Sequence, residues 1–218
     1  RETDEISNGS GSAYIYKLVD GIWEETKLLA SDGAGGDYFG HSVSISGDGT
    51  TVIVGAIDGD DYGTQSGSAY IYELVGGIWE ETKLLVSDGY TGDRIGDSVS
   101  ISDDGTTAIV GATYNDTNGS NSGSAYIYKL VKGAWQETKR LASAGYSDDN
   151  FGESVSVSGD GTSAIVGSRN NDDNGSGSGS AYIFELVDGV WEETKLLASD
   201  GATDDDFGHS VSISGDGT

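Results

Sequence analysis

The chain has 218 residues, with 37 acidic side chains against 11 basic ones, which gives a formal net charge of -26. A surface this acidic repels nucleic acid and anionic membranes, and excludes both as default partners. No stretch approaches the roughly 18 apolar residues of a membrane-spanning helix, so no membrane insertion is expected, and without cysteine the fold has no disulfide.

One sequence unit recurs four times with a fixed step of 56 residues. The alanine of the motif GSAYIY, or GSAYIF in the last copy, marks each unit: Ala13, Ala69, Ala125 and Ala181. The dipeptide FG, once IG, ends at Gly40, Gly96, Gly152 and Gly208. Four copies with no change of period indicate a single structural unit repeated along the chain.

Within one period, short runs of alternating apolar and polar residues predict β-strands. In HSVSIS (41–46), Val43 and Ile45 alternate with serines, which is the period of a strand. GDG then predicts a tight turn, and the β-branched run TTVIVGA (50–56) predicts a buried strand. SGSAYIYEL (66–74) predicts a third strand, and a second tight turn leads to IWEETKLL (78–85), whose charges suit a sheet edge. The unit is therefore expected to be a four-stranded antiparallel meander.

Such meanders, with glycine and aromatic residues at fixed places in each unit, are typical of β-propeller blades. We therefore predict an all-β fold, a β-propeller built from four-stranded antiparallel blades. A β-solenoid is the main competitor, but its coils are usually shorter and do not need two tight hairpins in each period.

The four units predict a single repeat array over residues 1–218. Complete blades are expected at 39–94, 95–150 and 151–206. A further blade is split, with its third and fourth strands in 1–38 and its first strand in 207–218, and it lacks its second strand because TVIVGA does not recur there. We therefore expect that the chain is an excerpt of a longer array, or that a neighbouring chain supplies the strand.

The stretch FGHSVSISGDGTTVIVGA, with FG before the first strand and VGA ending the second, resembles the FG-GAP repeat of integrin α-subunit propellers. It is closer still to bacterial and algal versions, and the resemblance covers every period. It implies a non-catalytic, extracellular adhesion module.

The sequence departs from the integrin repeats in two ways. The integrin-type calcium loop between the first two strands is reduced here to one aspartate in each copy, and the proline of GAP is absent. The reduced set is Asp48, Asp104, Asp160 and Asp216.

Two sets of aspartates recur in register in the long loops, which the strand order places together at one end of the blades. The first set lies two residues before the FG or IG dipeptide: Asp37, Asp93, Asp149 and Asp205. The second set lies between the second and third strands: Asp60, Asp116 and Asp172. Converging carboxylates would suit Ca²⁺, which prefers oxygen ligands. Alternatively, aspartates of this kind accept backbone N–H bonds and fix turns, or form a solvated acidic surface. These alternatives stay open.

The same loops contain four N-glycosylation sequons, at Asn8, Asn115, Asn118 and Asn174. Asparagine, glycine, serine and threonine are abundant there, so chance also produces such triplets. If the protein is secreted by a eukaryote, we expect at least one of these residues to carry a glycan.

The aromatic residues and histidines are interpreted mainly as structural. One tryptophan and one tyrosine per unit are expected to pack between blades, although exposed tryptophans could also stack on sugars. These sets are Trp23, Trp79, Trp135 and Trp191, and Tyr14, Tyr70, Tyr126 and Tyr182. His41 and His209 follow FG, but Asp97 and Glu153 hold the equivalent places, which argues against a zinc or catalytic pair.

Catalysis finds little support, because an active site needs one asymmetric set of residues and the candidates here recur in every unit or vary freely. We therefore expect that the protein is not an enzyme.

Two candidate functions remain. The first is an extracellular or cell-surface module that binds a protein or glycan through the acidic loops, with Ca²⁺ as a candidate cofactor. The second is a structural unit of a surface layer, stalk or filament, assembled from copies of itself by strand completion.

Overall fold

The computed structural model describes residues 8–140 and 145–218, whose strands form four separate antiparallel sheets. None of these residues is helical, so the described part of the chain contains no helix able to cross a membrane. The prediction of an all-β fold is confirmed.

Each sheet is a meander in which strands adjacent in sequence are adjacent in space. The first sheet contains β1 (Ala13–Val19) and β2 (Ile22–Leu28). The second contains β3 (Phe39–Ile45), β4 (Thr51–Ala56), β5 (Ser68–Val75) and β6 (Ile78–Leu84). The third contains β7 (Ile95–Ile101), β8 (Thr107–Ala112), β9 (Ser124–Val131) and β10 (Ala134–Arg140). The fourth contains β11 (Val155–Val157), β12 (Ser163–Ser168), β13 (Ser180–Val187) and β14 (Val190–Leu196).

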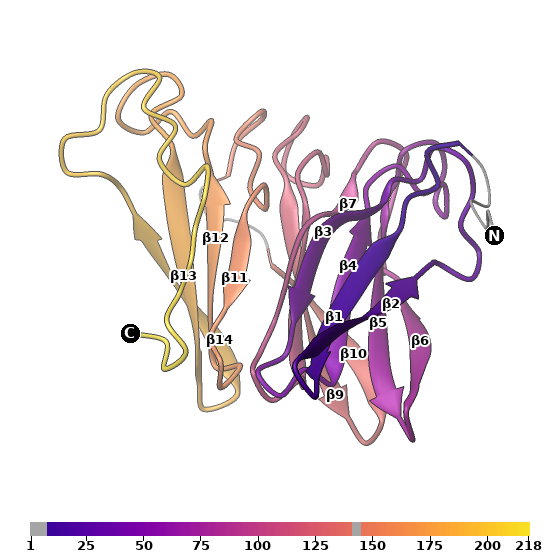
Figure 1. The fold of residues 1–218 in the computed structure, drawn as a ribbon. Helices are drawn as coiled ribbons and strands as arrows, with labels where there is room; N and C mark the ends of the chain where they lie inside the picture. Colours follow the sequence, from indigo (N-terminus) through magenta and orange to yellow (C-terminus); the bar gives the residue numbers. More distant parts are fainter. Residues whose placement is uncertain (1–7, 141–144) are drawn as a thin grey trace.

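The sheets stand side by side in sequence order, with the long loops at one end and the tight hairpins at the other (Figure 1). The three four-stranded sheets fall within the expected units 39–94, 95–150 and 151–206. This arrangement is consistent with propeller blades.

The expected first strand of the split blade is not formed. Residues 207–218 contain no strand, and Phe207 makes only an isolated bridge to Gly179. The segment is held against the fourth sheet instead, where Ser154 Oγ donates to the carbonyl of Gly208 at 2.7 Å. A strand requires a hydrogen-bonded neighbour, and none of the described residues pairs with this segment in a ladder. The sheet of β1 and β2 likewise gains no third strand from residues 8–140 or 145–218.

The FG dipeptide combines a core side chain with a backbone irregularity. Phe39 is buried and meets the ring of Tyr70 edge-on, with centroids 5.4 Å apart. Gly40 follows with φ of +93°, and a Cβ there would overlap the carbonyl oxygen of Ser12. The pairing of β3 with β4 shifts register just after Phe39. Glycine is therefore required where the chain enters the first strand of a unit.

Apolar side chains fill the spaces between neighbouring sheets. Val99 and Ile101 of β7 pack in one cluster with Ile53 of β4 and Ile71 of β5. Burying each such side chain stabilises the fold by roughly 1.5–3 kcal/mol. The predicted packing role is confirmed for three tyrosines, which are buried: Tyr70, Tyr126 and Tyr182. It is also confirmed for three tryptophans, which lie against these clusters: Trp79, Trp135 and Trp191.

The first copies of these aromatic residues behave differently. Tyr14 on β1 and Trp23 on β2 are exposed. No described sheet covers the outer face of the two-stranded sheet, so neither side chain has the neighbour that buries its equivalents.

Candidate functional site

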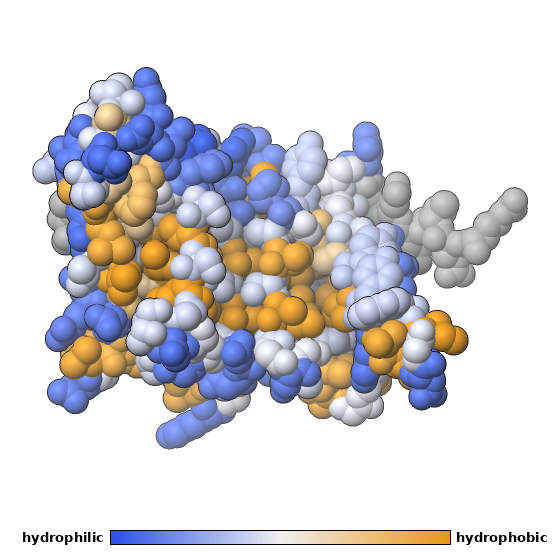
Figure 2. Space-filling model, turned by 60° about the vertical axis from the view of Figure 1, so that its left-hand side comes forward, coloured by the Kyte–Doolittle hydropathy of each residue, from blue (hydrophilic) through white to orange (hydrophobic). Residues whose placement is uncertain are grey.

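The two long loops of a unit run side by side at one end of the sheets (Figure 1). The loop after β4 and the loop after β6 are joined by backbone hydrogen bonds. The N–H groups of Gly92, Arg94 and Ile95 donate to the carbonyls of Thr64, Gln65 and Ser66, at 3.1, 3.3 and 2.9 Å. The same three bonds recur one unit later, from Asp148, Asn150 and Phe151 to Ser120, Asn121 and Ser122. This loop end is therefore an ordered surface, and hydrophilic residues gather along it (Figure 2).

Every aspartate of the first set closes a turn. In each copy the carboxylate accepts the backbone N–H of the residue three positions earlier. The bonds are Ala34 to Asp37 (2.7 Å), Tyr90 to Asp93 (2.8 Å), Tyr146 to Asp149 (2.9 Å) and Ala202 to Asp205 (2.7 Å). Burial raises the pKa of Asp37, and the bond from Ala34 opposes that rise.

Two members of this set are buried and bind a second donor. Asp93 and Asp149 are 2% and 3% exposed. The side-chain amide of Asn115 donates to Asp93, and that of Asn171 donates to Asp149, each at 3.0 Å. A buried carboxylate needs such donors, because an unpaired charge in the interior is costly.

The second set also binds backbone. Asp60, Asp116 and Asp172 each accept the N–H of the residue five positions later. The donors are Gln65 (2.9 Å), Asn121 (2.8 Å) and Gly177 (2.8 Å). The turn-fixing interpretation therefore describes all seven candidate residues.

A lysine lies where the acidic loops approach the sheets. Lys83 of β6 contacts the carboxylates of Asp32, at 2.7 Å, and Asp61, and its Nζ lies 5.1 Å from the ring centroid of Tyr70. Burial lowers the pKa of Lys83, but its bonds to the two carboxylates outweigh burial, so the net shift is upward. In the last complete unit Lys195 pairs with Asp173 in the same way.

These lysine sites were missed in the sequence because the partners come from different loops. Lys83 and Asp32 are 51 residues apart. The register offered a signal, since the lysine of the TKLL or TKRL motif recurs in all four units, and an aspartate follows the AS or VS pair in three of them, as Asp32, Asp88 and Asp200.

The donor sets do not fit a resident calcium ion. Across residues 8–140 and 145–218, no group of three or more His, Cys, Asp or Glu side chains converges as a metal site would require. The small cavity of about 150 Å³ bordered by Asp32, Asp37, Asp60 and Asp61 is also bordered by Lys83, whose ammonium already supplies a positive charge. Calcium binding stays a prediction from the sequence, without support from this geometry.

The sequon asparagines lie in unlike surroundings. Asn8, Asn118 and Asn174 are exposed, and glycosylation there stays a prediction. Asn115 is 3% exposed, and its amide nitrogen, to which a glycan would be attached, donates to Asp93. A glycan at Asn115 would require this buried side chain to move to the surface.

The residues that follow FG form two close histidine–carboxylate contacts, which the sequence interpretation did not anticipate. His41 Nε2 lies 3.2 Å from Asp97 Oδ1, and His209 Nδ1 lies 3.4 Å from Glu153 Oε1. Arg169 Nε also lies 3.0 Å from Glu153. Burial raises the pKa of Glu153, while Arg169 and His209 oppose the rise. Their shared position after FG was the available signal, since equivalent positions of neighbouring units meet.

At the opposite end, the aspartate of the SGDGT or SDDGT turn stabilises the hairpin itself. Asp104 Oδ1 accepts from Ser102 Oγ at 2.6 Å and from the N–H of Thr106 at 2.9 Å. Asp48 and Asp160 make the same bonds. This residue of the reduced calcium loop thus fixes a tight turn.

Comparison with solved structures finds low similarity. A crystal structure of Saccharomyces cerevisiae Sqt1 matches at 10% identity and a TM-score of 0.44, over 75% of this chain and 36% of that one. The periplasmic gluconolactonase PpgL of Pseudomonas aeruginosa matches at 17% identity and a TM-score of 0.44, over 79% and 46%. A putative TolB from Agrobacterium tumefaciens matches at 19% identity and a TM-score of 0.42, over 95% and 68%.

The chain therefore spans between about a third and a half of the first two of these structures. No curated protein matches the chain.

The family comparison is more specific. The model of the FG-GAP repeat matches residues 23–72, 79–128, 135–184 and 191–218, which is most of the chain and includes all four units. Each match begins at the tryptophan of the last strand of one unit, and each of the first three ends in the third strand of the next. The chain belongs to the FG-GAP repeat family.

Proposed function

We propose that this chain is a non-catalytic, extracellular β-propeller-type module whose acidic loop end binds a cationic segment of another protein. The observation that carries the proposal is the construction of that end. Its aspartates recur at fixed positions, and hydrogen bonds to their own loops hold them in place. A preorganised charged surface loses little conformational entropy on binding and steers an oppositely charged partner.

Part of the negative charge of these loops is exposed to solvent. Asp148, Asp204 and Asp206 are exposed and adopt positive φ values of 66°, 62° and 55°. Residues other than glycine rarely adopt this conformation, although aspartate and asparagine tolerate it best. The loop backbone therefore fixes the direction in which each of these side chains leaves the loop.

The absence of a catalytic role is inferred from repetition. The carboxylates of the loops recur from unit to unit, whereas chemistry at a substrate needs one asymmetric set of groups. Calcium is not part of the proposal, since carboxylates attract a cationic segment directly.

Titration calorimetry with an arginine-rich peptide of about twelve residues, in EDTA, tests the proposal. The loop variant carries Asp148→Asn, Asp204→Asn and Asp206→Asn, which remove charge while asparagine preserves the backbone conformation. The control carries Asp20→Asn and Asp188→Asn, at hairpin residues of the opposite end that also have positive φ. We expect saturable binding that weakens about tenfold in the loop variant and falls with added salt.

Equal weakening in the loop variant and the control would show general attraction to a polyanion, and the proposal would then be wrong. Absence of saturable binding to wild-type protein would also refute it. Binding of a glycan instead of the peptide would show that the ligand is a carbohydrate, and the proposed cationic protein segment would be wrong.

A structural role is a second candidate, favoured by one observation. At both ends of the described array, apolar side chains are less buried than their equivalents inside it: Tyr14 is 47% exposed at one end, and Ile183 is half-buried at the other, whereas Tyr70 and Ile71 are buried. Sedimentation velocity over a range of protein concentrations tests this role, because a monomer at every concentration would argue against assembly.

A further inference from the structure

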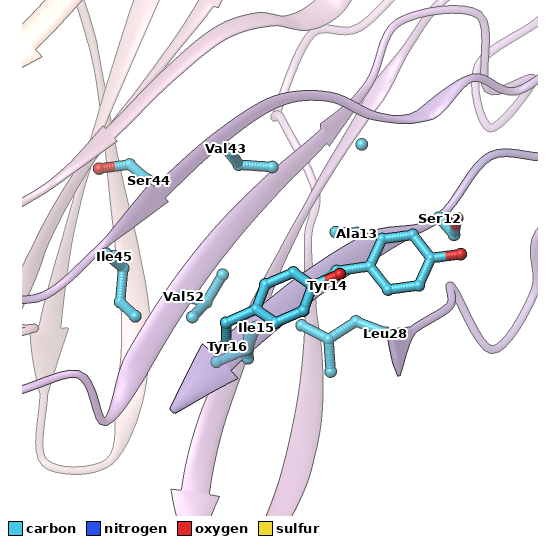
Figure 3. Close-up of a pocket in the computed structure, with 11 residues that line it drawn as sticks. Ser12, Ala13, Tyr14, Ile15, Tyr16, Leu28, Val43, Ser44, Ile45 and Val52 are labelled. Carbon is cyan, nitrogen blue, oxygen red and sulfur yellow. The ribbon is translucent and has the colours of Figure 1, made fainter. Parts of the chain in front are cut away.

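The free edge of β1 lies beside an apolar groove. β5, β9 and β13, the equivalents of β1, each pair with a strand on both sides. β1 pairs only with β2 among the described residues. Next to this free edge is a groove of about 550 Å³, bordered by Ile15 and Tyr16 of β1, Val43 and Ile45 of β3 and Val52 of β4 (Figure 3).

The apolar residues that border the groove from β3 are buried at the equivalent places of the next two units. Val43 and Ile45 are 58% and 51% exposed, whereas their equivalents Val99 and Ile101 are 8% and 5% exposed. Ile53, the third residue of β4, packs in the same cluster as Val99 and Ile101 and helps to cover them. One unit later, Ile109 of β8 belongs to the cluster that contains Val155 and Val157. The groove therefore has the shape left when the second strand of a unit is not in place.

We propose that this groove and the free edge of β1 bind an extended six-residue strand of the type TVIVGA, donated by an FG-GAP repeat outside the described fold. The inference is independent of the acidic loop end. β-Strand addition of this kind uses main-chain bonds for affinity and side-chain pockets for specificity.

The register of the bound strand follows from the repeat. β4 pairs antiparallel with β5 from Thr51 opposite Glu73 to Ala56 opposite Ser68. Shifted by one period, the incoming strand would lie opposite residues 12–17. Its third residue would face Ile15 and cover Val43 and Ile45, as Ile53 faces Ile71 and covers Val99 and Ile101.

The fifth residue must be glycine. Gly55, Gly111 and Gly167 hold this position in the three complete units, and a Cβ on each would overlap the carbonyl oxygen of Gly96, Gly152 or Gly208. The equivalent carbonyl in the groove is that of Gly40. A side chain at position five would therefore prevent the strand from reaching the edge of β1, which separates this site from an unspecific apolar surface.

The test uses a fluorescently labelled peptide of residues 47–60, GDGTTVIVGAIDGD, whose aspartates keep it in solution. Anisotropy measures its binding to the protein. The matched peptide replaces the glycine equivalent to Gly55 by alanine. The matched proteins are Ile45→Asp in the groove and Ile78→Asp on β6, both at exposed positions where an acidic residue does not enter the core.

We expect saturable binding of the first peptide, weakened about tenfold or more by the alanine and by Ile45→Asp but unchanged by Ile78→Asp. Absence of saturable binding, or equal binding of the two peptides, would overturn the proposal. If the protein instead dimerises and Ile45→Asp abolishes the dimer, a second copy fills the groove and the proposed occupant is wrong.

Discussion

Removing the hydroxyl of one buried tyrosine should destabilise the protein far more than removing the equivalent hydroxyl one unit later. Tyr126 is fully buried, and its hydroxyl donates to Asp88 Oδ1 at 2.8 Å. Burial, and then the bond to this carboxylate, raise the pKa of Tyr126. Tyr182 is equally buried, but no carboxylate accepts a hydrogen bond from its hydroxyl among the described residues. The sequence explains the difference, since the position equivalent to Asp88 is Ala144.

The magnitude follows from these partners. A hydrogen bond to a charged group contributes about 1.5–3 kcal/mol, and Tyr126→Phe also leaves Asp88 with one donor fewer. We therefore expect Tyr126→Phe to lower the free energy of unfolding by about 2 kcal/mol. Tyr182→Phe breaks no bond to a carboxylate among the described residues, so its effect should be about 0.5 kcal/mol or less.

Equilibrium unfolding in urea, followed by tryptophan fluorescence, measures both variants against wild type. A loss of about 2 kcal/mol corresponds to a fall of roughly 4–8 °C in Tm for a protein of this size. Equal losses from the two substitutions would refute the claim that the inter-sheet tyrosine bond, rather than packing of the ring, distinguishes these positions.

Three further predictions concern a glycine, a turn and an ion pair. Gly111→Ala, whose Cβ would overlap a carbonyl of the next unit, should cost about 2–4 kcal/mol in urea unfolding, against about 1 kcal/mol for Gly21→Ala, where only the positive φ opposes the change. Burial raises the pKa of Asp104, but the hydroxyl and backbone donors that bind its carboxylate outweigh burial, so the pKa is lowered overall. Its contribution to stability is therefore complete above the unfolded pKa near 3.8 and is lost as the pH falls, so thermal melts of Asp104→Asn should depend less on pH in this acidic range. Lys83→Met should lower the unfolding free energy by about 2 kcal/mol because it leaves two carboxylates without their cation, whereas Lys27→Met, at the exposed equivalent position, should leave it almost unchanged.

Most of the strand pattern could be predicted from the sequence because the residues within each strand carry the signal for it. Alternation in HSVSIS, the β-branched run before VGA and the glycine turns fix the strands and their order within each complete unit. Residues 207–218 show the limit of this reasoning. They repeat the letters of β3 and the turn that follows it, yet form no strand, because a strand also requires a neighbour.

The candidate site was only partly predictable. The positions of the loop aspartates followed from the period, but the same residue types serve calcium binding and turn fixing equally well. Only the geometry, such as the bond from Tyr90 to Asp93, distinguishes the two roles. Contacts between units, such as Lys83 with Asp32 or His41 with Asp97, depend on how sheets pack, which no single period contains.

The most direct test of the proposed function is the titration of wild-type protein, loop variant and hairpin control with the arginine-rich peptide in EDTA. If the acidic loop end is a preformed binding surface, the wild type and the hairpin control bind the peptide with similar affinity without calcium, and the loop variant binds about tenfold more weakly. Binding that appears only when calcium is added, or that is lost equally in both variants, would contradict it.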